Sequence, residues 1–423
     1  MERKLSSVFE IIVIASPSFC FSSSRFRSLY PLKFLQSSTH TPFFNVANTM
    51  LVIKDTQLAL IHIPLRLYPS FLQSILQLLL PTVDEDEQRP RSNGSDSAQP
   101  LQEHPFLNIS VTPIECSVAC PRAIVQSIFA PARNALGPAD RDSVIISSED
   151  YVVMQVDGEG LEAGQRVLEL TSPLAMAGIS IFFITTYFSD YILVPQRARA
   201  QVIAALESRG FAFEPSNSSY TSSAFSHRAT SSTSSFDNPL PGTPPPTSVS
   251  ELQVRTFATL KKHNIVPTVE SDIQLIQCAG RKDSSRTAST TSDRLNLGLV
   301  RSLAGGPNFL SLTLTDTEPA SLLLEKRMLP FFGSSNDSVL LGSKEDIIVP
   351  IILDLRTLPL ESTGIVCGVA GRLVGGTKMG LMDAVEMSYL STARAGTVMV
   401  AEDELHRALA ALRSEGAENG VFN

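Results

Sequence analysis

Residues that form disulfides or bind metals are scarce in this chain. Of its 423 residues only five are cysteine and six are histidine, and both kinds are dispersed. Cys116 and Cys120 have no histidine nearby, so neither a disulfide framework nor a zinc site is expected. Free buried thiols in a reducing, cytoplasmic compartment fit this usage better. We expect no metal and no other cofactor, and we interpret His62, which lies in a predicted strand, as structural.

Runs of basic residues and long apolar runs are also lacking. The net charge is −8 and Lys and Arg are scattered, which argues against a nucleic-acid partner. The apolar segment 172–194 contains Asp190 and many Thr and Tyr residues, and segment 67–80 is too short to span a bilayer. No membrane span is therefore expected.

No catalytic constellation is present in the sequence. Gly371, Gly376, Thr377 and Lys378 come near a phosphate-binding loop, but Lys and Thr stand in the wrong order. The segment also follows a predicted helix, whereas a phosphate loop follows a strand. A flexible loop is the simpler interpretation, and we expect the protein not to be an enzyme.

One stretch of 27 residues occurs twice. Residues 184–210 align with residues 390–416 without a gap, at an offset of 206 positions, and seven aligned positions are identical. Internal repetition indicates a fold built from copies of one unit. A protein of that kind commonly binds its ligand between the copies.

Polar, low-complexity segments divide the chain. Segments 83–103, 214–250 and 281–293 are rich in charged residues, Ser, Thr or Pro, so we expect disordered loops or linkers there. Residues 1–49 show no clear period and precede a second Met at position 50. They are interpreted as an N-terminal extension, dispensable for stability, with a transit peptide as the alternative.

Between these segments the hydrophobic pattern repeats the order βαββαβ. The predicted fold class is α+β, with tandem ferredoxin-like units in four copies and two pairs. The units are expected at 50–140, 145–213, 251–346 and 347–416. Helices are predicted at 67–80, 122–136, 162–176, 197–208, 294–303, 325–331, 364–373 and 402–413.

The segment SPLAMAGISIFFITTYFSDYILV at 172–194 resembles the ACT domain, a regulatory module that binds small ligands. The segment STGIVCGVAGRL at 362–373 is similar to the first helix of such a unit. Four units in two pairs resemble the CASTOR family, the cytosolic arginine sensors upstream of TOR complex 1. The likeness covers about residues 50–416 and is strongest in the second and fourth units.

This resemblance implies a ligand pocket between the second and fourth units. Ser180 and Ile181 match one wall, and Glu361 and Thr392 match the other. For Ser180, a ligand wall and a small packing residue are both open. The family's second, ligand-facing acid is Ser362 here.

The turn that completes the second wall departs further from the family. Its aromatic is Ala393 and its aspartate is Gly396, while Arg394 adds a positive charge. A site that binds arginine requires carboxylates, which pair with the two parallel N–H groups of the guanidinium. Arginine stays open as the ligand, with a degenerate pocket or one tuned to another ligand as the alternatives. Glu361 is the remaining acid for a ligand's cationic group.

The resemblance also implies a partner surface. Tyr187 and Asp190 match the loop that faces the GATOR complex in the family, and plain turn chemistry is the alternative for both. The leading hypothesis is a non-enzymatic amino-acid-binding regulator of TOR-type signalling. A homodimer is the oligomeric state left open beside a monomer. The alternatives are a ligand-free interaction scaffold and a regulatory subunit of an amino-acid-metabolic enzyme.

Overall fold

The computed structural model describes residues 50–79, 104–157, 162–214, 246–281, 288–333, 338–374 and 384–413. All of them belong to the second of the two units into which the chain divides, Asn45–Asn423. The predicted extension 1–49, the acidic loop 83–103 and most of the predicted linker 214–250 lie outside the described residues.

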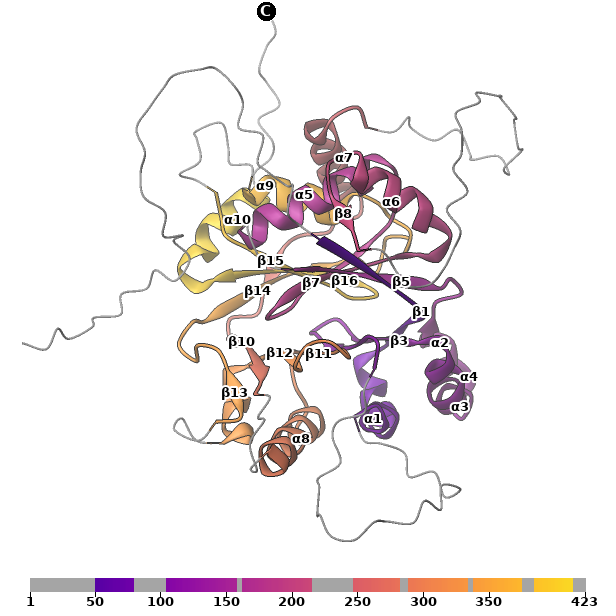
Figure 1. Ribbon diagram of the computed structural model, residues 1–423, viewed down its shortest axis with the longest axis vertical. Coiled ribbons are helices and arrows are strands. Elements are labelled where there is room, and N and C mark those ends of the chain that lie inside the picture. The colour runs from indigo at the N-terminus through magenta and orange to yellow at the C-terminus, as the bar shows by residue number, and fades with distance from the viewer. Residues whose placement is uncertain are drawn as a thin grey trace, which may run out of the picture. The chain divides into compact units, whose positions relative to one another are not determined.

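The described residues form sixteen strands and ten α-helices (Figure 1). The strands are β1 Met50–Ile63, β2 Leu107–Val111, β3 Cys116–Pro121, β4 Ile145–Ile146, β5 Tyr151–Asp157, β6 Phe182–Thr185, β7 Ser189–Pro195, β8 Ala212–Phe213, β9 Thr268–Val269, β10 Leu275–Gly280, β11 Leu310–Leu314, β12 Ser321–Glu325, β13 Leu340–Leu341, β14 Ile348–Asp354, β15 Ser388–Ser391 and β16 Ala395–Ala401. The helices are α1 Tyr68–Gln77, α2 Arg122–Ile124, α3 Ala130–Asn134, α4 Pro138–Ser143, α5 Ala163–Met176, α6 Arg199–Glu207, α7 Val249–Lys262, α8 Ala288–Ala304, α9 Ile365–Val374 and α10 Leu405–Arg413. Short 3-10 helices (Leu65–Leu67, Gln196–Ala198, Lys326–Phe332, Glu402–Glu404) and a π-helix (Val125–Phe129) adjoin them.

All sixteen strands belong to one sheet, and twelve of them close into an antiparallel ring. The order around the ring is β10-β12-β11-β2-β3-β1-β5-β7-β6-β15-β16-β14, and β14 returns to β10 through the pair Leu275–Ile348. The remaining strands, β4, β8, β9 and β13, are short and pair with β1, β10 or β14. The molecule is therefore built around a closed twelve-stranded β-barrel.

The prediction of four separate ferredoxin-like units is wrong. Strands pair across every expected border: β2 with β11, β6 with β15, β1 with β5 and β10 with β14. The physical reason is that a separate unit would leave strand edges with unpaired N–H and C=O groups. Joining the edges of neighbouring units satisfies these groups, and closing the ring removes the main edges altogether.

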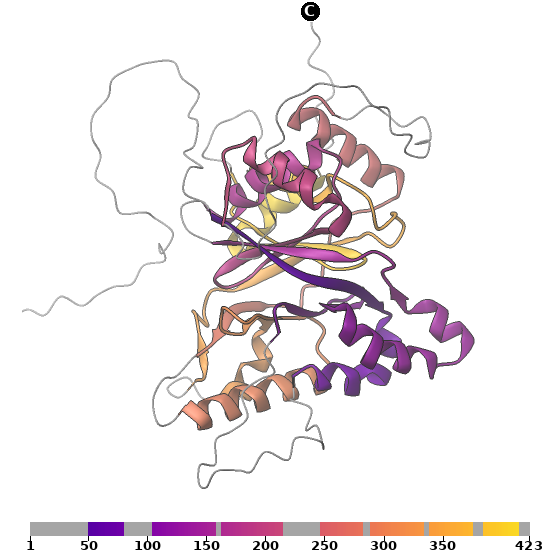
Figure 2. The ribbon, with the colours of Figure 1, turned by 45° about the vertical axis from the view of Figure 1, so that its right-hand side comes forward.

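Helices cover the barrel on two opposite sides (Figures 1 and 2). One side holds α5, α6, α9 and α10 over β5–β7 and β14–β16, with a core that includes Phe183, Val369 and Tyr389. The other side holds α1 and α8, with a core that includes Phe71 and Leu299. A third cluster lies between the two halves of the sheet and contains residues from both, such as Leu58, Tyr191, Leu323, Leu390 and Met399. The barrel interior is thus filled by side chains.

The two repeat copies adopt the same local structure. Strands β6 and β15, strands β7 and β16, and helices α6 and α10 begin and end at residues that differ by the repeat offset of 206 positions. The copies meet at β6 and β15, where Ile184 pairs with Leu390, its own equivalent in the other copy. An approximate two-fold axis therefore runs through this junction.

Helix α7, Val249–Lys262, was not predicted. Ser248 caps its N-terminus by accepting a hydrogen bond from the Glu251 N–H, at 3.2 Å. The helix packs closely on α9, because a Cβ on Gly368 would lie 2.6 Å from the Thr256 side chain. Glycine at that position of α9 is what lets the two helices approach.

The segment 172–194, which raised the question of a membrane span, comprises the end of α5 followed by β6 and β7. In the part of the chain that the structure describes, no helix is long and apolar enough to cross a bilayer. The four cysteines in that part, Cys116, Cys120, Cys278 and Cys367, are buried free thiols, as predicted, and Cys20 lies outside it. Burial raises the pKa of Cys120 and Cys278 to about 12, so these thiols are unreactive.

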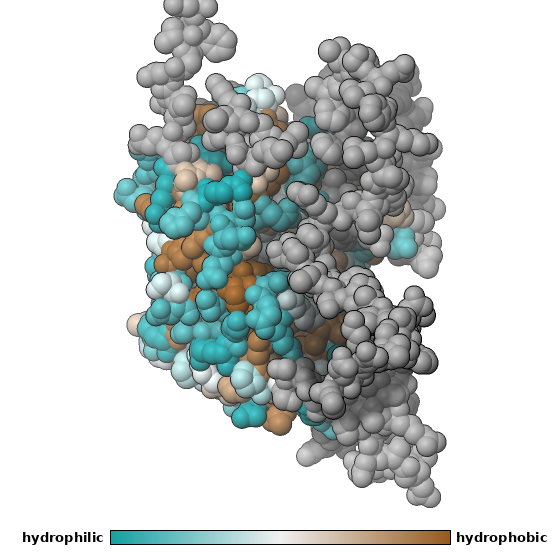
Figure 3. Space-filling view, turned by 90° about the vertical axis from the view of Figure 1, so that its left-hand side faces the viewer, coloured by the Kyte–Doolittle hydropathy of each residue, from teal (hydrophilic) through white to brown (hydrophobic). Residues whose placement is uncertain are grey.

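Apolar side chains also reach the surface in places. On the face shown in Figure 3, brown apolar residues emerge between teal hydrophilic ones. Tyr187 and Phe188 are among the exposed large apolar residues; their rings meet edge to face with centroids 4.9 Å apart. They form the turn between β6 and β7.

Candidate functional site

The junction between the repeat copies is held by a symmetric pair of hydrogen bonds. The Phe183 N–H donates to the Ser391 Oγ at 3.0 Å, and the Tyr389 N–H donates to the Thr185 Oγ1 at 3.1 Å. These bonds are equivalents of each other under the repeat offset. Side-chain oxygens thus take the place of carbonyls on either side of the Ile184–Leu390 pair.

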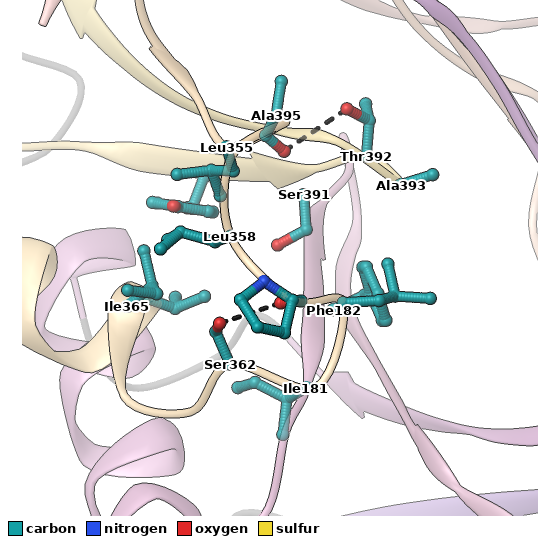
Figure 4. A pocket seen from close by; sticks show the side chains of 14 residues that line it. Ile181, Phe182, Leu355, Leu358, Ser362, Ile365, Ser391, Thr392, Ala393 and Ala395 are labelled. Atoms are coloured by element: carbon teal, nitrogen blue, oxygen red, sulfur yellow. Dashed lines mark hydrogen bonds between the residues drawn. The ribbon is translucent and has the colours of Figure 1, made fainter. Parts of the chain in front are cut away.

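A cavity of about 50 Å³ lies beside this junction (Figure 4). We call it the junction cavity. Four segments form it: the approach to β6, the loop from β14 to α9, the first turn of α9, and β15 with its turn to β16. It is lined by Ile181, Phe182, Leu355, Leu358, Pro359, Leu360, Ser362, Ile365, Val366, Tyr389, Ser391, Thr392, Ala393 and Ala395.

The lining is mostly apolar and carries no charged side chain. Ser362 Oγ donates to the Pro359 carbonyl at 2.8 Å, and the Ser391 hydroxyl is engaged by Phe183. The Tyr389 hydroxyl is buried and has no hydrogen-bond partner among the described residues. Burial raises the pKa of Tyr389 above its usual range, so the phenol stays protonated and can donate.

The volume of the junction cavity limits what it holds as it stands. One water needs roughly 10–15 Å³ of such space, so about 50 Å³ accommodates a few waters. A whole amino acid requires the cavity to widen. The loop between β14 and α9 is the side best able to move, because Arg356, Thr357, Pro359 and Glu361 on it are exposed.

A buried carboxylate holds the turn between β15 and β16. Glu115, fully buried, accepts hydrogen bonds from the Thr392 hydroxyl at 2.6 Å and the Arg394 N–H at 2.5 Å. Its other oxygen meets His62 Nδ1 at 2.5 Å, and the Ala393 N–H donates to Ser117 Oγ at 3.1 Å. Strands β1 and β3, together with Glu115 directly before β3, therefore fix one wall of the cavity. This contact could not be predicted from local pattern, because Glu115 and Thr392 are 277 positions apart.

The structure brings two of the four predicted ligand residues to the cavity. Ile181 and Thr392 line it. Ser180 is buried next to Ile181 but does not line the cavity in this structure, and Glu361 is exposed at its outside. Arg394 is half-buried and donates to the Leu358 carbonyl at 3.4 Å, so a cation lies close to the wall.

The two predicted partner residues lie in different surroundings. Tyr187 is partly exposed, and its N–H donates to Ser321 Oγ at 2.8 Å. Asp190 is fully buried in β7, and its Oδ2 accepts from Arg166 Nε of α5 at 2.5 Å. The predicted role of Asp190 in partner binding therefore stays a prediction, while its carboxylate visibly ties a helix to the sheet.

Gly396 is needed where it stands. A Cβ built on it would lie 2.3 Å from the Tyr389 hydroxyl oxygen, far inside van der Waals contact. We expect Gly396→Ala to lower the free energy of unfolding by about 1–3 kcal/mol, because the buried tyrosine ring must move. Urea unfolding checks this. Gly137→Ala, at a position with nothing within 4 Å, is the control and should change stability by less than about 1 kcal/mol. Equal effects of the two changes would contradict the close approach of Tyr389.

One segment of the chain matches a known domain family. Residues 146–208 match the ACT domain, so an ACT domain, commonly a ligand-binding regulatory module, is present from the end of β4 through α6. No curated protein matches the chain.

Several solved structures are similar in part. A protein of Agobacterium tumefaciens has 16% identity and a TM-score of 0.24, covering 39% of this chain and 92% of its own. The aspartate kinase from Synechocystis has 12% identity and a TM-score of 0.29, covering 90% of this chain and 57% of its own. The ligand-free regulatory subunit of aspartate kinase from Thermus thermophilus has 11% identity and a TM-score of 0.23, covering 38% of this chain and 96% of its own. At these TM-scores the likeness is partial and carries no conclusion about function.

Proposed function

We propose that the protein binds a free amino acid in the junction cavity and acts as a non-enzymatic regulator. The observation that carries this is the position of the cavity at the junction of the two repeat copies. One wall comes from the matched ACT domain, at Ile181 and Phe182, and the other comes from the second copy, at Ser391 and Thr392.

The resemblance to the cytosolic arginine sensors supports a place in TOR-type nutrient signalling, with a GATOR-like complex as the partner. The ligand itself is expected to differ from arginine. A guanidinium needs carboxylates, and the residues that line the cavity include none, while Arg394 lies near its wall. Glu361 could reach a cationic ligand only from outside the cavity.

A second function is favoured by one observation, the small volume of the cavity. A protein whose pocket has closed would serve as a ligand-free interaction scaffold. The third hypothesis, a regulatory subunit of an amino-acid-metabolic enzyme, uses the same site and differs only in the partner. Affinity purification of the full chain separates it from the first.

A thermal-shift screen of the full chain against the twenty amino acids tests the proposal. At a hundred times its Kd a ligand stabilises the folded state by about 2.7 kcal/mol, which gives a readable rise in Tm. We expect at least one amino acid with an uncharged side chain to raise Tm, and arginine to leave it unchanged. A Tm that none of the twenty alters would favour the scaffold.

A further inference from the structure

The approximate two-fold axis makes Ser180 and Glu386 equivalent. They are separated by the repeat offset of 206 positions, and the residues before them, Ile179 and Val385, are buried in the same core. Met387, the equivalent of Ile181, belongs to that core as well. The two segments that lead into β6 and β15 therefore follow the same path, and only the side chains differ.

At one of the two equivalent places, Glu386 reaches the start of a helix. Its Oε1 accepts a hydrogen bond from the Ala163 N–H, the first residue of α5, at 2.9 Å. Met387 packs beside Gly164 in the same turn. The first turn of α5 has no acidic residue of its own, so Glu386 supplies the acceptor that a helix N-terminus favours.

At the N-terminus of α9, no side chain among the described residues takes the position that the Glu386 side chain takes at α5. Helix α9 begins at Ile365, and Ile365 and Val366 line the junction cavity. Its first turn has no acidic residue either, and its first three N–H groups have no acceptor within the helix. Ser180 stands where Glu386 stands at α5, and it is two carbons shorter and uncharged.

The charges around the two helix starts also differ. Burial and the neighbouring Glu162 raise the pKa of Glu386, while the N–H groups of Ala163 and Gly164 lower it. The residue that precedes α9 is Gly364, so the position that Glu162 takes directly before α5 carries no charge at α9. The start of α9 is therefore the better of the two places for an outside anion.

A second, independent observation points to a ligand on the open side. Tyr389 lines the junction cavity, and its buried hydroxyl lacks a hydrogen-bond partner among the described residues. Its equivalent beside the closed place is Phe183, which has no hydroxyl to satisfy. A buried donor without a partner destabilises the cavity, so a polar group that enters it and accepts the hydrogen bond is favoured.

We propose that the N-termini of α5 and α9 are two equivalent anion sites. The Glu386 carboxylate occupies the site at α5, so only the site at α9 binds a ligand, one per chain. The ligand is a small amino acid with a polar, uncharged side chain. Its carboxylate takes the place at α9 that Glu386 takes at α5, and the Tyr389 hydroxyl donates a hydrogen bond to its side chain. This inference rests on the proposed function, because it names the ligand of the same cavity.

Pairs of amino acids that match in shape test the role of Tyr389. Threonine is compared with valine and asparagine with leucine, by calorimetry on the full chain. In at least one pair the polar member should bind about tenfold more tightly, and Tyr389→Phe should remove that preference. A preference for the apolar members, or one that Tyr389→Phe leaves intact, would overturn the assignment.

Filling the open place tests the role of the carboxylate. Ser180→Glu copies Glu386 and should weaken binding by more than a hundredfold, whereas Ser180→Gln, of the same length without the charge, should weaken it by about tenfold. Glu386→Gln, at the other place, should leave the ligand affinity unchanged. Equal losses with Glu and Gln at position 180 would mean that size alone acts there, and would overturn the anion assignment.

Ligand analogues keep the inference testable if Ser180→Glu does not fold. The amine that lacks the carboxylate of the best ligand should bind at least a hundredfold more weakly than the amino acid itself. An amine that binds within threefold would overturn the inference alone, since the wild type would still bind an amino acid. A wild type that binds no amino acid at all would overturn both this inference and the proposed function.

Discussion

Asp190→Ala is expected to lower the free energy of unfolding by about 3–5 kcal/mol. Asp190 is fully buried and Arg166 is 8% exposed, and the bond between them joins α5 to β7. Burial raises the pKa of Asp190, and the Arg166 guanidinium offsets part of this rise, so the charged carboxylate depends on its partner. Removing it leaves the guanidinium in the interior without its carboxylate, which is the costly way to break a buried ion pair.

Urea unfolding of the full chain measures this loss. Asp157→Ala is the matched control, because Asp157 lies at the exposed end of the neighbouring strand β5. It should change stability by less than about 1 kcal/mol. If Asp190→Ala is as mild as the control and instead weakens binding to a partner, the residue serves recognition and the structural account of it fails.

Glu115→Ala is expected to lower the free energy of unfolding by about 3 kcal/mol or more. The Thr392 hydroxyl, the Arg394 N–H and His62 all lose their acceptor at once. Each buried group left unpaired costs about 1–3 kcal/mol. Because these groups hold the turn from β15 to β16, ligand binding in the junction cavity should weaken as well.

Glu115→Gln separates the loss of hydrogen bonds from the loss of volume. The amide keeps one oxygen for Thr392 or Arg394, so its cost should be smaller than that of alanine. Urea unfolding and calorimetry on both variants check this order. Two variants that unfold like the wild type and bind normally would show that Glu115 does not support the wall.

The repeat identified the local structure well. It predicted the strand–turn–strand–helix order of both copies, and the bounds of β6 and β15 confirm the alignment residue by residue. Local hydrophobic period suffices for such elements, because each is encoded by neighbouring residues. The prediction of separate units was wrong because the pairing of strand edges is not encoded locally. The partner of an edge strand depends on residues far along the chain.

Helix α7 was missed although its start carries a local signal. Ser248 and Glu251 form the Ser-x-x-Glu pattern of a helix N-terminus, with Ser248 accepting from Glu251 and Glu251 bonding back to Thr247. The pattern follows a long polar segment, which led us to include its first residues in a linker. The glycines of α9, against which α7 packs, did not by themselves indicate a neighbouring helix.

The position of the candidate site came from the resemblance, and its chemistry came from packing. The resemblance predicted Ile181 and Thr392 as ligand residues, and both line the cavity. The exposure of Glu361 and the burial of the Tyr389 hydroxyl could not be predicted, because they depend on how distant segments pack. One available signal was overlooked. Extending the repeat alignment by a few residues pairs Ser180 with Glu386 and Phe183 with Tyr389, and these differences separate the open place from the closed one.

The central claim is that the junction cavity binds an amino acid, and calorimetry on three full-length proteins tests it most directly. The wild type should bind the best amino acid of the screen with one site per chain. Ile181→Glu, which puts a long charged side chain into the cavity lining, should abolish the binding. Leu297→Glu, the same kind of change at a residue 56% exposed on α8, should bind like the wild type. Binding that survives Ile181→Glu unchanged, or a wild type that gives no heat with any of the twenty amino acids, would contradict the claim.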